Sequence, residues 1–177
     1  MTVVPIHHAV LSVSDFERSL AFYRDVLGLR KTLESPVAGY ERYLHLPEGT
    51  TGRMAMLAAD ERTVGMVEII QWDIPGGAST SGPKLPGDPG VAMLAFELRD
   101  ETLEDVCRRL EAASIPLYSP ITPVELEGYP RFHTMLLQDP DGLLIELIQL
   151  PTRDDVRAYR AALRAQGAEP AGVGDAR

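Results

Sequence analysis

The sequence has little of several features that would point to particular classes of protein. Its only cysteine, Cys107, has no partner for an internal disulfide, so nothing suggests an oxidising compartment. No lysine or arginine cluster stands out, and the formal net charge of -9 repels nucleic-acid phosphates and anionic lipid. The N-terminus has no basic region followed by a long apolar stretch. We therefore expect a cytoplasmic protein with neither nucleic acid nor a membrane as partner.

What the sequence does contain is an internal repeat of a strand followed by a helix. Residues 6–13 and 91–98 are rich in apolar and β-branched types, and an amphipathic helical pattern follows each of them. The spacing of Ser14 and Glu17 predicts a capping box at the start of the first helix. The two apolar stripes are formed by Phe16, Leu20, Tyr23 and Leu27 and by Leu103, Val106, Cys107 and Leu110. A place in such a stripe favours a packed thiol over a nucleophile for Cys107.

Three more strands are predicted in each copy, near residues 29–34, 52–58 and 65–72 and near residues 116–122, 131–138 and 143–150. The predicted organisation is a first module at 1–72, a Gly/Pro-rich linker at 73–90, a second module at 91–150, and a C-terminal helix with a disordered tail at 151–177. Thr152 and Asp155 have the spacing of a cap for that helix. Residues 40–49 are longer than a hairpin needs, and we expect a helical turn there that could close over a pocket.

The last strand of each copy carries one glutamate that is a candidate site residue. Strand alternation places Glu68 on the same face as Ile70 and Trp72, and Glu146 on the same face as its own apolar neighbours. A carboxylate on an apolar sheet face loses hydration, so it needs a cation, a metal or an added proton. An exposed edge or an arginine partner is the alternative for a single glutamate. The repetition favours a paired site.

The first strand of each copy supplies the other candidates. His8 lies seven residues before Asp15, and Met93 lies seven residues before Asp100, so the repeat aligns His8 with Met93 and selects His8 over His7. Strand alternation places His8 on the face opposite the one that would pack against the helix. A lone strand histidine is more often a packed or surface residue than a ligand.

These motifs resemble the vicinal oxygen chelate superfamily, which includes glyoxalase I, methylmalonyl-CoA epimerase, extradiol dioxygenases and bleomycin-binding proteins. The resemblance covers about residues 5–150. It rests on His8-Ala-Val-Leu-Ser-Val-Ser-Asp15, Glu17-Arg-Ser-Leu-Ala-Phe-Tyr-Arg-Asp-Val-Leu-Gly28, Gly90-Val-Ala-Met-Leu-Ala-Phe96 and Asp139-Pro-Asp-Gly-Leu-Leu-Ile-Glu146. It implies an α+β fold in which two tandem βαβββ modules form a curved eight-stranded mixed sheet, shaped like a cup. The reaction is less determined, because one fold can host many chemistries.

The resemblance also implies a divalent metal held by one residue from the first and last strand of each module. The matching positions are His8, Glu68, Met93 and Glu146. Met93 departs from the family's usual histidine, and a thioether is a poor ligand for a hard metal, so the expected ligands are His8, Glu68 and Glu146. Zn, Ni, Mn, Co and Fe are not distinguished, and the metal could be absent because of Met93. His45 and His133 are weak candidates to replace the missing histidine, since counting along the hairpin places Phe132, Thr134 and Leu136, rather than His133, on the cup side.

Three functions follow from the resemblance. The first is a metal-assisted isomerase, epimerase or lyase, in which Glu146 or Glu68 moves a proton next to the carbonyl of a small molecule. The second is a metal-free binding or sequestration protein of the bleomycin-resistance type. An extradiol-type dioxygenase, which needs two histidines and one carboxylate on iron, ranks last. Candidates for the walls of the small-molecule site are Met93, Trp72, Tyr43 and Tyr40, and the family resemblance favours a homodimer.

Overall fold

The computed structural model describes residues 5–61, 64–76 and 89–167. Most of the predicted linker and the predicted disordered tail therefore lie outside the described residues. The chain divides into two compact units, one made of Met1–Leu85 with Asp139–Leu143 and the other of Pro86–Gln138 with Leu144–Arg177. Within the described part, no helix is long and apolar enough to cross a membrane.

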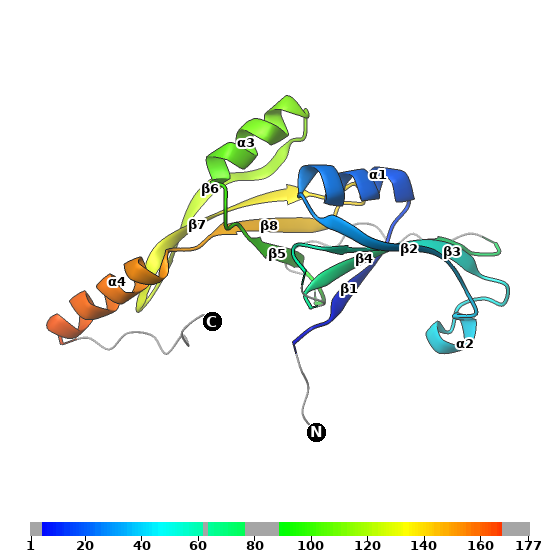
Figure 1. Cartoon of the computed structure of the whole chain (residues 1–177), viewed down its shortest axis with the longest axis horizontal. Helices are drawn as coiled ribbons and strands as arrows, with labels where there is room; N and C mark the ends of the chain where they lie inside the picture. Colours follow the sequence, from blue (N-terminus) through cyan, green and yellow to red (C-terminus); the bar gives the residue numbers. More distant parts are fainter. Residues whose placement is uncertain (1–4, 62–63, 77–88, 168–177) are drawn as a thin grey trace, which may run out of the picture. The chain divides into compact units, whose positions relative to one another are not determined.

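The first unit is a four-stranded sheet with one helix on it (Figure 1). Its strands lie in the order β1-β4-β3-β2, with β1 parallel to β4 and the other neighbours antiparallel. The predicted turn at 40–49 is present as the short helix α2. The elements are β1 (His8–Ser12), α1 (Phe16–Ala21) with a π-helical continuation (Phe22–Val26), β2 (Arg30–Ala38), α2 (Glu41–Leu44), β3 (Thr51–Ala58) and β4 (Met66–Asp73).

The start of α1 differs from the prediction. Asp15 is the N-cap, and its side chain accepts a hydrogen bond of 3.0 Å from the backbone N–H of Arg18. The predicted capping box of Ser14 and Glu17 is therefore wrong. The Ser14 hydroxyl instead donates to Asp141, a residue distant in sequence that the spacing rule could not include.

The second unit repeats the same architecture, with strands in the order β5-β8-β7-β6 and β5 parallel to β8. Capping boxes begin both of its helices, at Thr102 with Asp105 and, as predicted, at Thr152 with Asp155. The elements are β5 (Met93–Glu97), α3 (Leu103–Ala112), β6 (Leu117–Leu126), β7 (Tyr129–Gln138), β8 (Leu144–Gln149) and α4 (Arg153–Ala165).

Two of the edge strands, β2 and β6, are longer than predicted. β2, predicted near 29–34, continues through Pro36 to Ala38, and β6, predicted near 116–122, continues through Pro123 to Leu126. Both strands lie at the end of their sheets, where one side of the backbone has no strand partner. Proline is tolerated at such edges because its missing N–H takes no ladder hydrogen bond away.

The strand registers agree between the units. His8 pairs with Met66 at the start of β1, and Met93 pairs with Leu144 at the start of β5, so His8 and Met93 occupy equivalent positions. Val10 then pairs with Glu68 as Ala95 pairs with Glu146. The predicted α+β fold of two βαβββ repeats is confirmed. A single curved eight-stranded cup stays a prediction.

A glutamine fastens the helix to the sheet in each unit. Gln71 Oε1 accepts a hydrogen bond of 3.1 Å from the backbone N–H of Phe16, and Gln149 Oε1 accepts one of 3.1 Å from that of Leu103. The backbone N–H groups of Phe16 and Leu103 lie in the first turn of a helix, where no carbonyl oxygen of the helix itself can accept from them. Because each unit has the same glutamine bond, Phe16 in α1 corresponds to Leu103 in α3, and the other residues of the two helices can be aligned from this pair.

Cys107 lies in the apolar stripe of α3, partly buried, with its Sγ 3.5 Å from Met135 Sδ. Burial, together with the carboxylates of Glu111 and Glu104, raises the pKa of the thiol. A raised pKa reduces the thiolate that a nucleophile needs. These facts favour the packed role over the reactive one.

Candidate functional site

The first candidate pair lies on the sheet of the first unit. His8 Nε2 is 3.1 Å from Glu68 Oε2, and the two side chains are 32% and 12% exposed. The parallel pairing of β1 with β4 brings them together, since it places Glu68 opposite Val10, two residues from His8. The other ring nitrogen of His8, Nδ1, is 2.7 Å from His7 Nδ1. One imidazole nitrogen and one carboxylate oxygen therefore lie next to each other on the sheet of the first unit.

The second candidate pair differs, because Met93 stands where the first unit has His8. Glu146 Oε1 instead lies 2.9 Å from the hydroxyl of Thr134, which is also 3.1 Å from the carbonyl oxygen of Leu147. Thr134 lies on the same face of the sheet as Glu146, as predicted, whereas His133 points to the opposite face and is exposed. Counting placed Thr134 on the correct face, but nothing in the sequence indicated that its hydroxyl would contact Glu146.

The first candidate pair offers donor atoms that a divalent metal can use. Imidazole nitrogen and carboxylate oxygen suit Zn and neighbouring metals, so His8 and Glu68 fit as two of the ligands. Among the described residues, no group of three or more His, Cys, Asp or Glu side chains is arranged to hold an ion. Glu146 belongs to the other unit. That it shares a metal with His8 and Glu68 stays a prediction.

An aromatic cluster lies at the far end of the β4 strand that carries Glu68. The indole N–H of Trp72 donates a hydrogen bond of 3.1 Å to Ser12 Oγ, and its ring lies 6.4 Å from that of Tyr40. Tyr43, whose ring is 6.3 Å from that of Tyr40, is 76% exposed. Trp72 is paired with Gly52, where an added Cβ would lie 2.7 Å from the Gln71 carbonyl oxygen and 3.2 Å from Trp72 Cε3. The backbone at this point leaves no room for a larger residue.

The chain resembles several known proteins. The family model described as the glyoxalase/bleomycin resistance protein/dioxygenase superfamily matches residues 5–147. Protein YaeR of Escherichia coli (strain K12) is 25% identical over 144 residues, which are 81% of this chain and 95% of YaeR.

Solved structures share the fold. A glyoxalase family protein from Bacillus cereus has a TM-score of 0.70 and 17% identity, covering 85% of this chain and 97% of that one. TnmS3, an antibiotic binding protein from Streptomyces sp. CB03234, has a TM-score of 0.54 and 18% identity, covering 85% of this chain and 99% of its own. At these identities the structures show the fold alone. With the family match over most of its length, the chain belongs to the glyoxalase/bleomycin resistance protein/dioxygenase superfamily.

Proposed function

We propose that this protein is a small-molecule isomerase, epimerase or lyase that moves a proton next to a carbonyl with the help of a divalent metal. The contact of His8 Nε2 with Glu68 Oε2 carries the proposal, because it puts two metal-binding atoms together on one sheet face. Glu146 is the proposed third ligand. The Zn, Ni, Mn, Co and Fe ions are all compatible with one histidine and two glutamates.

The roles of the side chains follow from their chemistry. His8, Glu68 and Glu146 would hold the divalent ion, which would supply positive charge to polarise a carbonyl oxygen of the small molecule. His8 would supply a ring nitrogen as a ligand, and with Nδ1 in contact with His7 its Nε2 faces Glu68. Either Glu68 or Glu146 takes the proton from the adjacent carbon and returns it. The Thr134 hydroxyl holds one oxygen of Glu146 and so restricts its rotation.

A metal-free binding or sequestration protein is the second candidate function. Met93 favours it, because a thioether weakens a hard-metal site while it suits an apolar ligand wall. The cluster of Trp72, Tyr40 and the exposed Tyr43 offers aromatic surface for such a ligand. The similarity in fold to an antibiotic binding protein points the same way. The homodimer and the cytoplasmic location stay predictions.

Glu146→Gln tests the proposed third ligand. We expect protein purified without chelator to carry a divalent metal, and the variant to lose most of it, because a neutral amide replaces an anionic oxygen donor. Elemental analysis and a Mn²⁺ titration measure both. Glu125→Gln, an exposed glutamate of the same unit paired with Arg131, is the matched control. Wild-type protein that binds no divalent ion, with the same small-molecule binding in the variant, would instead favour the sequestration function.

Met93→His tests the position at which the two units differ. We expect the affinity for Zn²⁺ or Mn²⁺ to rise by at least about tenfold, since a fourth donor replaces a sulfur that hard ions avoid. Met93→Leu, which keeps the volume without adding a donor, should leave the affinity unchanged. Equal affinities for the histidine and leucine variants would place Met93 away from any metal.

A further inference from the structure

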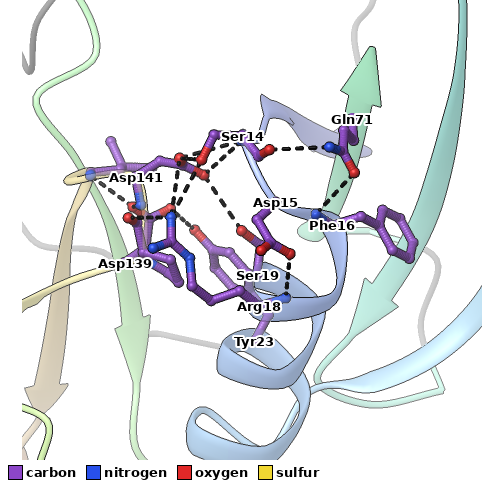
Figure 2. A network of polar contacts seen from close by, with 11 residues as sticks. Ser14, Asp15, Phe16, Arg18, Ser19, Tyr23, Gln71, Asp139 and Asp141 are labelled. Atoms are coloured by element: carbon purple, nitrogen blue, oxygen red, sulfur yellow. Dashed lines mark hydrogen bonds and ion pairs between the residues drawn. The ribbon is translucent and has the colours of Figure 1, made fainter. Parts of the chain in front are cut away.

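A short turn from the second half of the sequence completes the first unit. Residues Asp139–Leu143, here called the aspartate turn, connect β7 to β8, yet they belong to the compact unit built on α1. Figure 2 shows Asp139 and Asp141 of this turn beside the polar side chains that they contact. The two strands that the turn joins belong to the other unit. The chain therefore passes from one unit into the other and back within five residues.

The deepest contact of this turn is a buried tyrosine–aspartate pair. The Tyr23 hydroxyl donates a hydrogen bond of 2.8 Å to Asp139 Oδ2, and the two residues are 0% and 6% exposed. Asp139 Oδ1 accepts from the backbone N–H groups of Asp141 and Leu143, at 2.9 Å and 2.8 Å. Burial and the Asp139 carboxylate raise the pKa of the phenol, so Tyr23 remains a donor. Both carboxylate oxygens are satisfied, as burial of the group requires.

The second aspartate of the turn contacts the start of α1. Asp141 accepts hydrogen bonds from the backbone N–H and the hydroxyl of Ser14, and from the Ser19 hydroxyl at 3.4 Å. Arg18 Nη2 donates to the carbonyl oxygen of Pro140 at 3.1 Å and lies 3.8 Å from Asp141 Oδ1. Ser14, Arg18, Ser19 and Tyr23, here called the α1 receptor, thus offer donors and positive charge to a turn that carries two carboxylates.

The repeat provides an internal comparison. With Phe16 aligned to Leu103 by the two glutamine bonds, the positions of Arg18, Ser19 and Tyr23 correspond to Asp105, Val106 and Leu110 of α3. Val106 and Leu110 are 1% exposed and have no side-chain donor, and Asp105 would repel a carboxylate. The described residues up to position 76 all belong to the first unit. Of these two helices, α1 presents polar groups that match an aspartate turn, and α3 does not at the corresponding positions.

We propose that the α1 receptor is an intramolecular docking site for the Asp139-Pro140-Asp141 turn, and that this docking holds the second half of the chain to the first without help from the connecting segment at 77–88. The inference is independent of any metal or substrate. Burial of Tyr23 and Asp139 excludes water from the central bond, which makes it stronger than a surface ion pair.

The test uses the full-length protein with a protease recognition sequence inserted into residues 77–88. After cleavage, we expect the two fragments to elute together in size-exclusion chromatography. Tyr23→Phe and Asp141→Ala should each raise the dissociation constant of the cleaved pair at least about tenfold, because each removes bonds to a carboxylate. Arg108→Ala is the control, since it breaks an exposed Arg108–Asp105 ion pair on the equivalent helix.

Hydrogen exchange on the uncleaved chain gives a second measurement if a variant folds poorly after cleavage. The backbone amides of Ser14 and Leu143, which donate to Asp141 and Asp139, should exchange at least about tenfold faster in Tyr23→Phe and in Asp141→Ala, and at the wild-type rate in Arg108→Ala. Fragments that separate in the wild type would overturn the proposal. So would equal dissociation constants in the wild type and in the combined Tyr23→Phe, Asp141→Ala protein.

Discussion

His8→Ala is expected to bind Mn²⁺ or Zn²⁺ more than about 100-fold more weakly than the wild type. Changes in groups that merely support a ligand cost about 10-fold to 100-fold in metal affinity, and loss of a direct ligand costs more. Only two of the proposed ligands would remain, both glutamates. Isothermal titration calorimetry on metal-free protein measures the effect.

The neighbouring histidine provides the control for this experiment. His7 contacts His8 through Nδ1 but does not reach Glu68 by any contact found among the described residues, so His7→Ala removes only a supporting group and should weaken the affinity by about 10-fold to 100-fold, less than His8→Ala. Thermal unfolding should be similar in both variants, because His8 is about one-third exposed. An affinity in His8→Ala equal to that of His7→Ala would contradict the metal-assisted function.

Asp139→Ala is expected to lower the free energy of unfolding by about 3 kcal/mol. The change leaves the buried Tyr23 hydroxyl and the N–H groups of Asp141 and Leu143 without their acceptor. An unsatisfied buried donor costs about 1–3 kcal/mol, and the backbone amides regain part of this from water. For a chain of this size the midpoint of thermal unfolding should fall by about 6–12 °C. Calorimetry or urea unfolding measures the loss.

Asp139→Asn separates the hydrogen bonds from the charge. The amide keeps one oxygen for the backbone N–H groups and can donate to the Tyr23 oxygen, so we expect a smaller loss, about 1 kcal/mol. Asp154→Ala removes an exposed carboxylate paired with Arg157 and should change stability by less than about 0.5 kcal/mol. If Asp139→Ala were as stable as Asp154→Ala, the buried pair with Tyr23 would have no role in stability.

Local patterns in the sequence were sufficient for the repeated fold. Strand alternation and helical stripes depend on neighbours only a few residues apart, so they place Glu68 and Glu146 at equivalent positions and align His8 with Met93. The same local reasoning failed at Ser14, whose hydroxyl contacts Asp141 in place of the predicted capping-box partner. It also ended β2 and β6 several residues too early, next to prolines that a strand at the edge of a sheet can accommodate.

The superfamily, the two βαβββ repeats and the asymmetry between His8 and Met93 could all be predicted from the sequence. Which side chains make contact could be seen in the three-dimensional structure but not in the sequence pattern. The pair of His8 and Glu68 depends on parallel strands whose partners are about 60 residues apart in the sequence. The pairs of Thr134 with Glu146 and of Tyr23 with Asp139 depend likewise on strand pairing or docking. No local propensity encodes such contacts, because they arise when distant segments bury their apolar faces and the remaining polar groups must find partners.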